Sequence, residues 1–139
     1  MGLDMYLEQK MFVNPGRVEV MVDGKVREDV SAIIYEIGYW RKANAIHNWF
    51  VKNVQNGVDE CQYSYLNIHH LETLKALCLE VLADHTKAEA LLPPIEGFFF
   101  GSTGIDEWYF EDLENTVKSI DKALASQEGW GDFYYHSSW

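Results

Sequence analysis

The stretch Gly38-Tyr39-Trp40-Arg41-Lys42-Ala43-Asn44-Ala45-Ile46-His47-Asn48-Trp49-Phe50 decides how the chain is interpreted, and it lies within a longer apolar segment at 29–55. Residues three and four apart share one face of a helix. Apolar residues recur here at that spacing, at Val30, Ile33, Ile34, Ile37, Trp40, Val51 and Val54. The spacing predicts one long helix over 29–55 whose apolar face points into the core.

Three polar residues, Arg41, Asn44 and His47, fall inside this predicted apolar face. Burial of a neutral polar group without a partner costs about 1–3 kcal/mol, and an unpaired ion costs more. The fold therefore either satisfies these three side chains internally or keeps them for a ligand. The sequence leaves both answers open.

Shorter periodic segments surround this helix. Two strands over Leu3–Val13 and Arg17–Val22, joined by Asn14-Pro15-Gly16, predict an N-terminal hairpin, and Asp23-Gly24 is a strong turn signal. The pattern further predicts strands over Cys61–Ile68 and Gly97–Ser102, helices over Leu71–Leu91 and Asp106–Ser126, and a docked aromatic tail at 130–139 as a last strand.

This order of elements predicts an α+β fold. We expect one small domain over residues 1–139, with a mixed or antiparallel sheet of about four strands covered by three helices. Hydrophobic residues make up 47% of the chain and aromatic residues 14%, which is enough for a core of its own.

The formal net charge of −11 restricts the partners of the protein. Such a surface repels phosphate backbones, so direct nucleic-acid binding is disfavoured, and it attracts proteins with basic surfaces. No apolar run approaches the roughly 18 residues of a membrane span, and the N-terminus lacks a signal-like segment. We expect a cytoplasmic protein without membrane contact, in which Cys61 and Cys78 are reduced thiols.

One candidate site is a pocket for a small ligand. Glu36, Arg41, Asn44 and His47 on the predicted first helix combine acid–base and anion-binding groups. Ser102 and Thr103 belong to a Gly-rich loop before the third helix, where a phosphate can bind. This loop lacks the lysine of a P-loop, and acidic residues follow it directly.

A zinc site is a second candidate. His47, Cys61, His69 and His70 are ligand types that zinc prefers, and the predicted topology can bring them together. None of them stands in a close pair such as Cys-x-x-Cys, so the signal is weak.

A protein-binding surface is the third candidate. The start of the third predicted helix combines carboxylates with aromatic side chains, at Asp106, Glu107, Trp108, Tyr109, Glu111, Asp112 and Glu114. Exposed Trp and Tyr residues are frequent anchors of protein interfaces, and carboxylates there favour a partner rich in Lys and Arg.

Three motifs resemble a family of small acidic proteins carried by bacteriophages, prophages and some bacterial genomes. They are Gly2-Leu3-Asp4-Met5-Tyr6-Leu7, Gly38-Tyr39-Trp40-Arg41-Lys42-Ala43-Asn44, and Gly97-Phe98-Phe99-Phe100-Gly101-Ser102-Thr103 with Asp106-Glu107-Trp108-Tyr109. The resemblance spans nearly the whole chain. It implies a counter-defence role in the host cell, of the anti-CRISPR or anti-restriction kind.

The leading hypothesis is therefore an acidic binding protein without catalysis. It inhibits a host defence nuclease of the Cas9 kind by occupying a basic surface that otherwise binds nucleic acid. The alternative is a binding protein or enzyme for a nucleotide or phosphate, built on the cluster of Arg41, Asn44 and His47.

Overall fold

The structure is a computed structural model that describes residues 2–97, 100–126 and 131–139. In chain order its elements are β1 (Asp4–Phe12), β2 (Val20–Val22), β3 (Lys25–Arg27), β4 (Ala32–Arg41), α1 (Asn44–Asn53), β5 (Ser64–Leu66), α2 (Ile68–Ala83), the 3-10 turn η1 (His85–Lys87), α3 (Ala88–Leu91), α4 (Glu107–Ala125) and β6 (Gly131–Ser138). The expected α+β class is confirmed.

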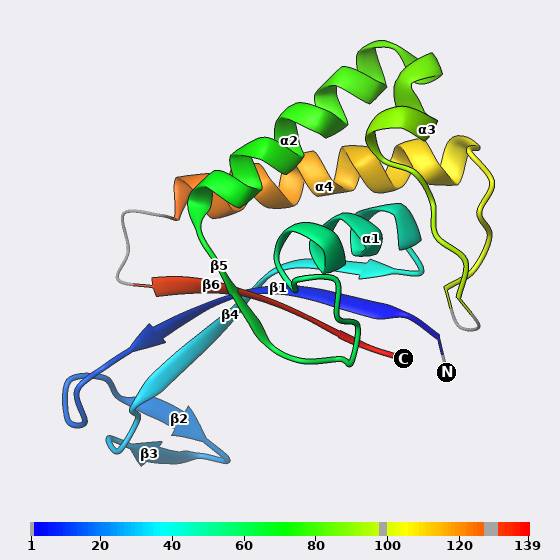
Figure 1. The fold of residues 1–139 in the computed structure, drawn as a ribbon. Coiled ribbons are helices and arrows are strands. Elements are labelled where there is room, and N and C mark those ends of the chain that lie inside the picture. The colour runs from blue at the N-terminus through cyan, green and yellow to red at the C-terminus, as the bar shows by residue number, and fades with distance from the viewer. Residues whose placement is uncertain (1, 98–99, 127–130) are drawn as a thin grey trace.

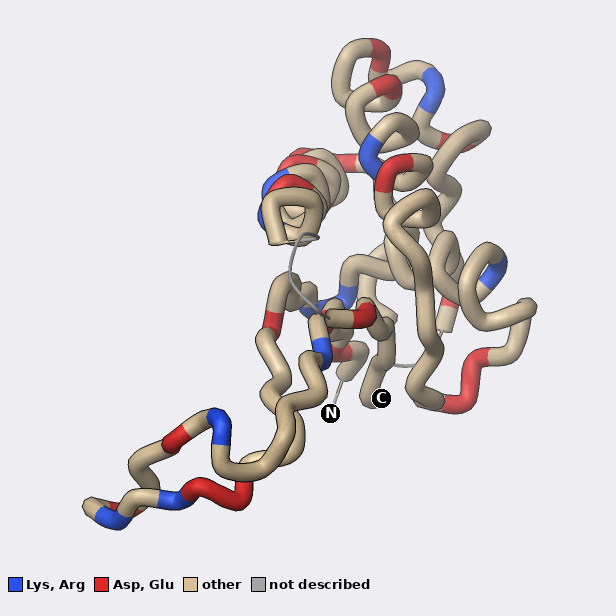
Figure 2. Tube along the Cα trace, turned by 90° about the vertical axis from the view of Figure 1, so that its left-hand side faces the viewer, with Lys and Arg blue, Asp and Glu red and all other residues tan. Residues whose placement is uncertain are grey.

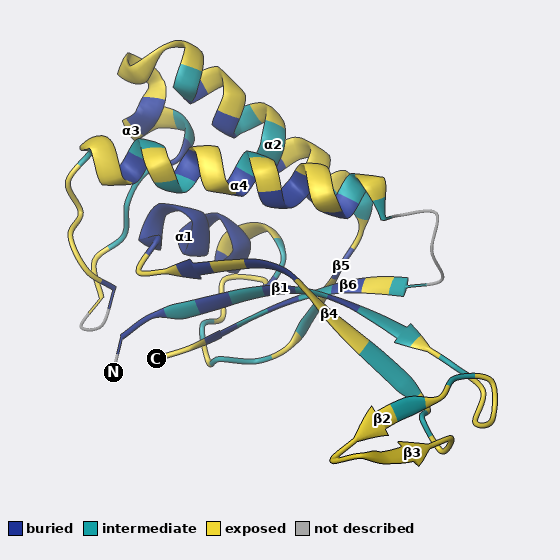
Figure 3. Ribbon diagram, turned by 180° about the vertical axis from the view of Figure 1, so that it is seen from behind, coloured by how far each residue is buried: buried dark blue, intermediate teal, exposed yellow. Residues whose placement is uncertain are grey.

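The main sheet has four strands in the order β4-β1-β6-β5, and each neighbouring pair is antiparallel. The helices lie on one face of this sheet (Figure 1). Side chains of β1 alternate accordingly, with Met5 and Leu7 fully buried beneath the helices. Tyr6 and Glu8 point to the opposite face and are half-buried. The sheet therefore has one face without helices, which lies below the strands in Figure 3.

The predicted helix over 29–55 is wrong in its first half. Residues 32–41 form β4, paired with β1, and the helix begins only at Asn44. The misleading signal comes from a β-bulge at Ile37, because Leu7 pairs with Gly38 while Glu8 pairs with Glu36. A bulge places an extra residue in one strand. As a result Ile37 and Trp40 are both buried, at a spacing of three that imitates a helix.

The predicted N-terminal hairpin is also wrong, because β1 pairs with β4 and β6 rather than with residues 17–22. The Asp23-Gly24 turn is real and joins β2 to β3 in a separate two-stranded sheet. Both turn residues have positive φ, at 49° and 76°, which suits a tight hairpin turn.

The later elements follow the prediction more closely. The aromatic tail is a strand, β6, in the interior of the sheet, and the predicted third helix is α4. The predicted helix over 71–91 breaks at Asp84 into α2, η1 and α3. The strand expected over Gly97–Ser102 lies partly outside the described residues, and none of its described residues is in a strand.

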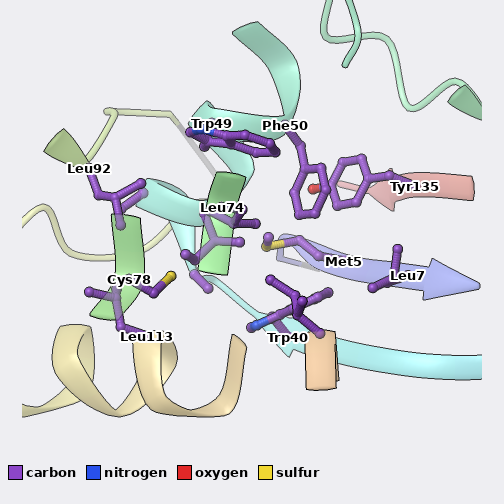
Figure 4. Packing of buried hydrophobic residues seen from close by; sticks show 14 of the residues in the cluster. Met5, Leu7, Trp40, Trp49, Phe50, Leu74, Cys78, Leu92, Leu113 and Tyr135 are labelled. Carbon is purple, nitrogen blue, oxygen red and sulfur yellow. The ribbon is translucent and has the colours of Figure 1, made fainter. Parts of the chain in front are cut away.

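The core lies between the sheet and the helices (Figure 4). Phe50 of α1 stacks on Tyr135 of β6 with ring centroids 3.9 Å apart. Cys78 of α2 is a buried free thiol, and burial raises its pKa to about 12. None of the described helices is long and apolar enough to cross a membrane.

Trp40 fastens β4 to α4 by a buried hydrogen bond. Its Nε1–H donates to Thr116 Oγ1 at 2.9 Å, and the Thr116 hydroxyl donates to Asp112 O at 2.7 Å. Because Thr116 is fully buried, a water molecule cannot take the place of its hydroxyl as the acceptor for the Trp40 N–H.

We expect Thr116→Val to lower the free energy of unfolding by about 1–3 kcal/mol, because it leaves a buried indole N–H without an acceptor. Urea denaturation followed by circular dichroism measures this change. Thr73→Val, at an exposed position of α2, is the control and is expected to stay within about 0.5 kcal/mol of wild type. Equal stabilities for the two variants would contradict the assigned role of Thr116.

Candidate functional site

Residues of the predicted ligand pocket and of the predicted protein-binding surface line one hollow of about 290 Å³ beside the start of α1. Its walls come from the turn between β4 and α1, the loop at 101–104 and the first turns of α4. The lining includes Arg41, Lys42, Asn44, Gly101, Ser102, Asp106, Trp108 and Asp112. A set of basic side chains and a set of acidic side chains therefore face the same space.

The turn between β4 and α1 is built by backbone constraints. Lys42 has a φ of 56°, an uncommon value for a non-glycine residue, and its N–H donates to Leu3 O at 2.7 Å. Gly101, at a φ of 82°, lies so near that an added Cβ would be 3.2 Å from Lys42 Cβ. Glycine at this position lets the loop approach the turn closely.

Asn44 is satisfied inside the protein. Its side-chain amide donates to Phe100 O at 3.0 Å and to Ser102 O at 2.8 Å, and its Oδ1 accepts from the Ile95 N–H at 3.2 Å. It thus ties the segment at 95–102 to the first turn of α1. The side-chain amide of Asn44, which was predicted as a ligand group, therefore holds this loop in place by hydrogen bonds.

His47 is also satisfied inside the protein, and it does not line the hollow. The fully buried ring contacts Tyr135 Oη through Nδ1 at 2.6 Å and Asp59 Oδ2 through Nε2 at 2.9 Å. Asp59 Oδ1 accepts from Trp139 Nε1 at 3.1 Å, which docks the last residue of the chain. Burial lowers the pKa of His47, against the opposing effect of Asp59, so the ring favours its neutral form.

Arg41 and Glu36 are the exposed members of the predicted cluster. Arg41 Nη1 lies 3.2 Å from Asp4 Oδ1, and about half of its side chain remains accessible at the rim of the hollow. Glu36 lies on the part of β4 beyond the bulge and does not line the hollow. Thr103 is exposed on the loop but is also absent from the lining.

The other predicted zinc ligands, His69, His70 and Cys61, do not contact a common point and have different surroundings. His69 Nδ1 lies 3.4 Å from Glu72 Oε1, and His70 Nδ1 accepts from the Asn67 N–H in the capping box of α2. Cys61 is a half-buried free thiol. Across the part of the chain that the structure describes, no group of three or more His, Cys, Asp or Glu side chains is placed to hold a metal ion.

The predicted partner-binding residues divide into buried and exposed members. Tyr109 is buried, and its hydroxyl donates to Leu92 O at 2.7 Å. Asp106 caps α4 by accepting from the Tyr109 N–H. Trp108 is 68% exposed, the highest value among the large apolar residues of the described chain.

We use the name acidic surface for Trp108 and four carboxylates of this set, of which Asp112 is half-buried. A second, shallower hollow of about 470 Å³ is also lined by Trp108, so this residue borders both depressions. The acidic surface consists of Trp108 with the carboxylates around it at Glu107, Glu111, Asp112 and Glu114.

Asp112 is the carboxylate of the acidic surface whose pKa is shifted. Burial, together with the neighbouring charges of Glu111 and Asp106, raises the pKa of Asp112 to about 6. Sequence reasoning named Asp112 as a surface charge and gave no sign of its desolvation. It also missed the role of Lys42 and the hydrogen bond from Trp139 to Asp59, because both depend on contacts between segments far apart in the chain.

The comparisons with known proteins add no assignment. No protein-family model, no curated protein and no solved structure matches the chain. The function must therefore be argued from the geometry of these residues.

We expect Asp112→Asn to stabilise the protein at neutral pH. The folded state holds the proton of Asp112 more tightly than the unfolded chain, whose ordinary pKa is 3.8. Wild-type stability is therefore lost as the pH rises from about 4 to about 6, where the folded carboxyl ionises. The asparagine variant has no such loss.

Denaturant titrations of both proteins across this pH range measure the difference. The gain of Asp112→Asn should be absent at the acidic end and complete above the folded pKa. Glu114→Gln, at an exposed position of the same helix, is the control. A difference that does not change with pH would contradict the desolvation of Asp112.

Proposed function

We propose that the protein is a non-catalytic binding protein that docks on a basic surface of a protein partner through its acidic surface. The exposed indole of Trp108 carries this proposal. Tryptophan is among the side chains most enriched in interface hot spots, and the indole of Trp108 is 68% exposed and therefore available to a partner.

The surrounding charges define the kind of partner. Glu107, Glu111 and Glu114 rim the shallower hollow beside Trp108, and Asp112 lines the other. A Lys or Arg of the partner gains both from these carboxylates and from the face of the indole. The net charge of −11 disfavours nucleic acid in the same place.

We further propose that the partner is a nucleic-acid-binding nuclease of a host defence system, of the Cas9 kind. The choice of a nuclease rests on the resemblance of the three motifs to phage and prophage proteins, and it agrees with the charge. By covering a basic channel or a neighbouring surface, the protein keeps nucleic acid from the enzyme. Inhibition by occupation needs no catalytic residue.

We expect Trp108→Ala to raise the Kd for the nuclease about thirtyfold, equivalent to about 2 kcal/mol at a hot spot. Titration calorimetry with a purified Cas9-type nuclease measures the Kd, and cleavage of target DNA reports inhibition. Leu79→Ala, which truncates another exposed apolar residue on α2, is the control. Binding by Trp108→Ala at the wild-type Kd would reject the anchor.

The electrostatic part of the proposal has its own test. Glu107→Gln/Glu111→Gln/Glu114→Gln should slow association with the nuclease, and added salt should slow wild-type association in the same way. The control Glu60→Gln/Glu89→Gln/Glu96→Gln removes the same charge from exposed positions elsewhere. Stopped-flow rates that do not depend on salt would reject electrostatic docking.

A second candidate function is supported by the basic wall of the hollow. The first turn of α1 has no side-chain cap and no acidic residue, and Arg41 and Lys42 directly precede it. Such a helix start attracts anions. Asp106 and Asp112 on the opposite wall oppose a highly charged ligand, which makes this candidate the weaker one.

We expect inorganic phosphate to raise the thermal midpoint of wild type in a dose-dependent way if the hollow binds an anion, because a ligand stabilises the state that binds it. Arg41→Gln/Lys42→Gln should remove this effect. Sulfate tests whether the response is specific, and an equal concentration of chloride corrects for ionic strength. Equal midpoints with phosphate and chloride would exclude this candidate.

A further inference from the structure

The hollow beside the start of α1 brings opposite charges to one space of about 290 Å³. The turn between β4 and α1 contributes Arg41 and Lys42, and the start of α4 contributes Asp106 and Asp112. These segments meet at the same end of the molecule (Figure 1). A small molecule in the hollow would therefore contact cationic and anionic groups at once.

These charges do not pair with one another across the hollow. Arg41 pairs with Asp4 at 3.2 Å, and about half of its side chain remains accessible. No ion pair among the described residues includes Lys42, Asp106 or Asp112. Opposite charges that line the same space without contact leave room for a ligand that joins them.

Asp112 has the most to gain from a cation in the hollow. It is half-buried, and burial together with the charges of Glu111 and Asp106 raises its pKa to about 6. No basic residue is among the causes of this shift, so the basic side of the hollow does not compensate the carboxylate. An ammonium group bound beside Asp112 would supply the counter-charge.

The basic side of the hollow departs from the charge of the rest of the chain. Arg41 and Lys42 are the only two consecutive basic residues in the sequence, which has 22 Asp and Glu against 11 Lys and Arg. Figure 2 shows acidic segments spread over the helices and over the hairpin of β2 and β3. Ala45 and Ile46, in the uncapped first turn of α1, line the same hollow. Because first-turn N–H groups lack acceptors within the helix, they add to the attraction of the two basic residues for a carboxylate.

The size and the remaining lining of the hollow restrict its ligand further. Small-molecule sites span about 300–1,000 Å³, and this hollow lies at the lower limit of that range. Gly101 and Gly104 have no side chains to fill it, and the exposed indole of Trp108 offers an apolar surface at its edge. These features suit a small molecule that carries both charges and a modest apolar group.

We propose that this hollow binds a free amino acid as its zwitterion. The carboxylate of the ligand lies against Arg41, Lys42 and the first turn of α1, and its ammonium group lies against Asp106 and Asp112. The side chain of the ligand points toward Trp108. Such a ligand satisfies both sides of the hollow, whereas phosphate meets two opposing carboxylates and a simple amine meets two opposing cations. This binding goes beyond docking on a protein partner and does not depend on it.

Isothermal titration calorimetry with the full chain tests this proposal, with glycine, L-leucine and L-phenylalanine as probes. At least one of the three should bind saturably. The N-acetyl derivative of that amino acid keeps the carboxylate and loses the ammonium charge, and its amide keeps the ammonium group and loses the carboxylate. Each derivative should bind about tenfold or more weakly than the parent, because it lacks one charged contact.

One variant tests the acidic side of the hollow. Asp106→Asn/Asp112→Asn should weaken binding of the amino acid about tenfold or more, and asparagine at position 106 is still able to cap α4. The control Glu60→Gln/Glu89→Gln removes the same charge from exposed positions elsewhere and should bind like wild type. Circular dichroism checks that each variant is folded.

A second variant tests the basic side. Arg41→Gln/Lys42→Gln should also weaken binding of the amino acid about tenfold or more. Lys52→Gln/Lys118→Gln makes the same change of charge at exposed positions elsewhere and should leave the Kd unchanged.

The derivatives separate this proposal from the alternatives. If none of the three amino acids bound, the proposal would be overturned. An N-acetyl derivative that bound as tightly as its parent would also overturn it, in favour of a simple anion site, and an equally tight amide would do so in favour of a cation site. The nuclease titration with Trp108→Ala measures a different interaction, so failure of partner docking and failure of amino-acid binding are distinguished.

Discussion

The bulge that pairs Leu7 with Gly38 and Glu8 with Glu36 determines how β4 meets the helical layer. It turns Ile37, Gly38 and Trp40 toward the helices together. A Cβ at Gly38 would lie 3.0 Å from Ser119 Cβ, so α4 packs directly on the strand there. Trp40 then fastens Thr116 of α4 by its indole N–H. The position of α4, and with it the acidic surface, depends on this local irregularity.

The sequence predicted regular elements well where one pattern was strong. The amphipathic spacing of α4, the capping position of Asp106 and the apolar tail are local features, and each appears close to its predicted place. The segment at 29–55 failed because a bulge gave a strand the apolar spacing of a helix. The β-branched residues Val30, Ile33 and Ile34 favour a strand, and Gly38 disfavours a helix. The apolar spacing was given more weight than these propensities.

The candidate site was predictable in its residue types but not in its geometry. Asn44 and His47 were correctly recognised as polar groups in apolar surroundings. Their partners are Phe100, Ser102 and Ile95 for the amide, and Tyr135 and Asp59 for the ring. Most of these contacts join segments dozens of residues apart, which no local pattern encodes. Asn44 and His47 therefore each hold other segments of the chain in place. The loop at 101–104 in turn forms one wall of the hollow.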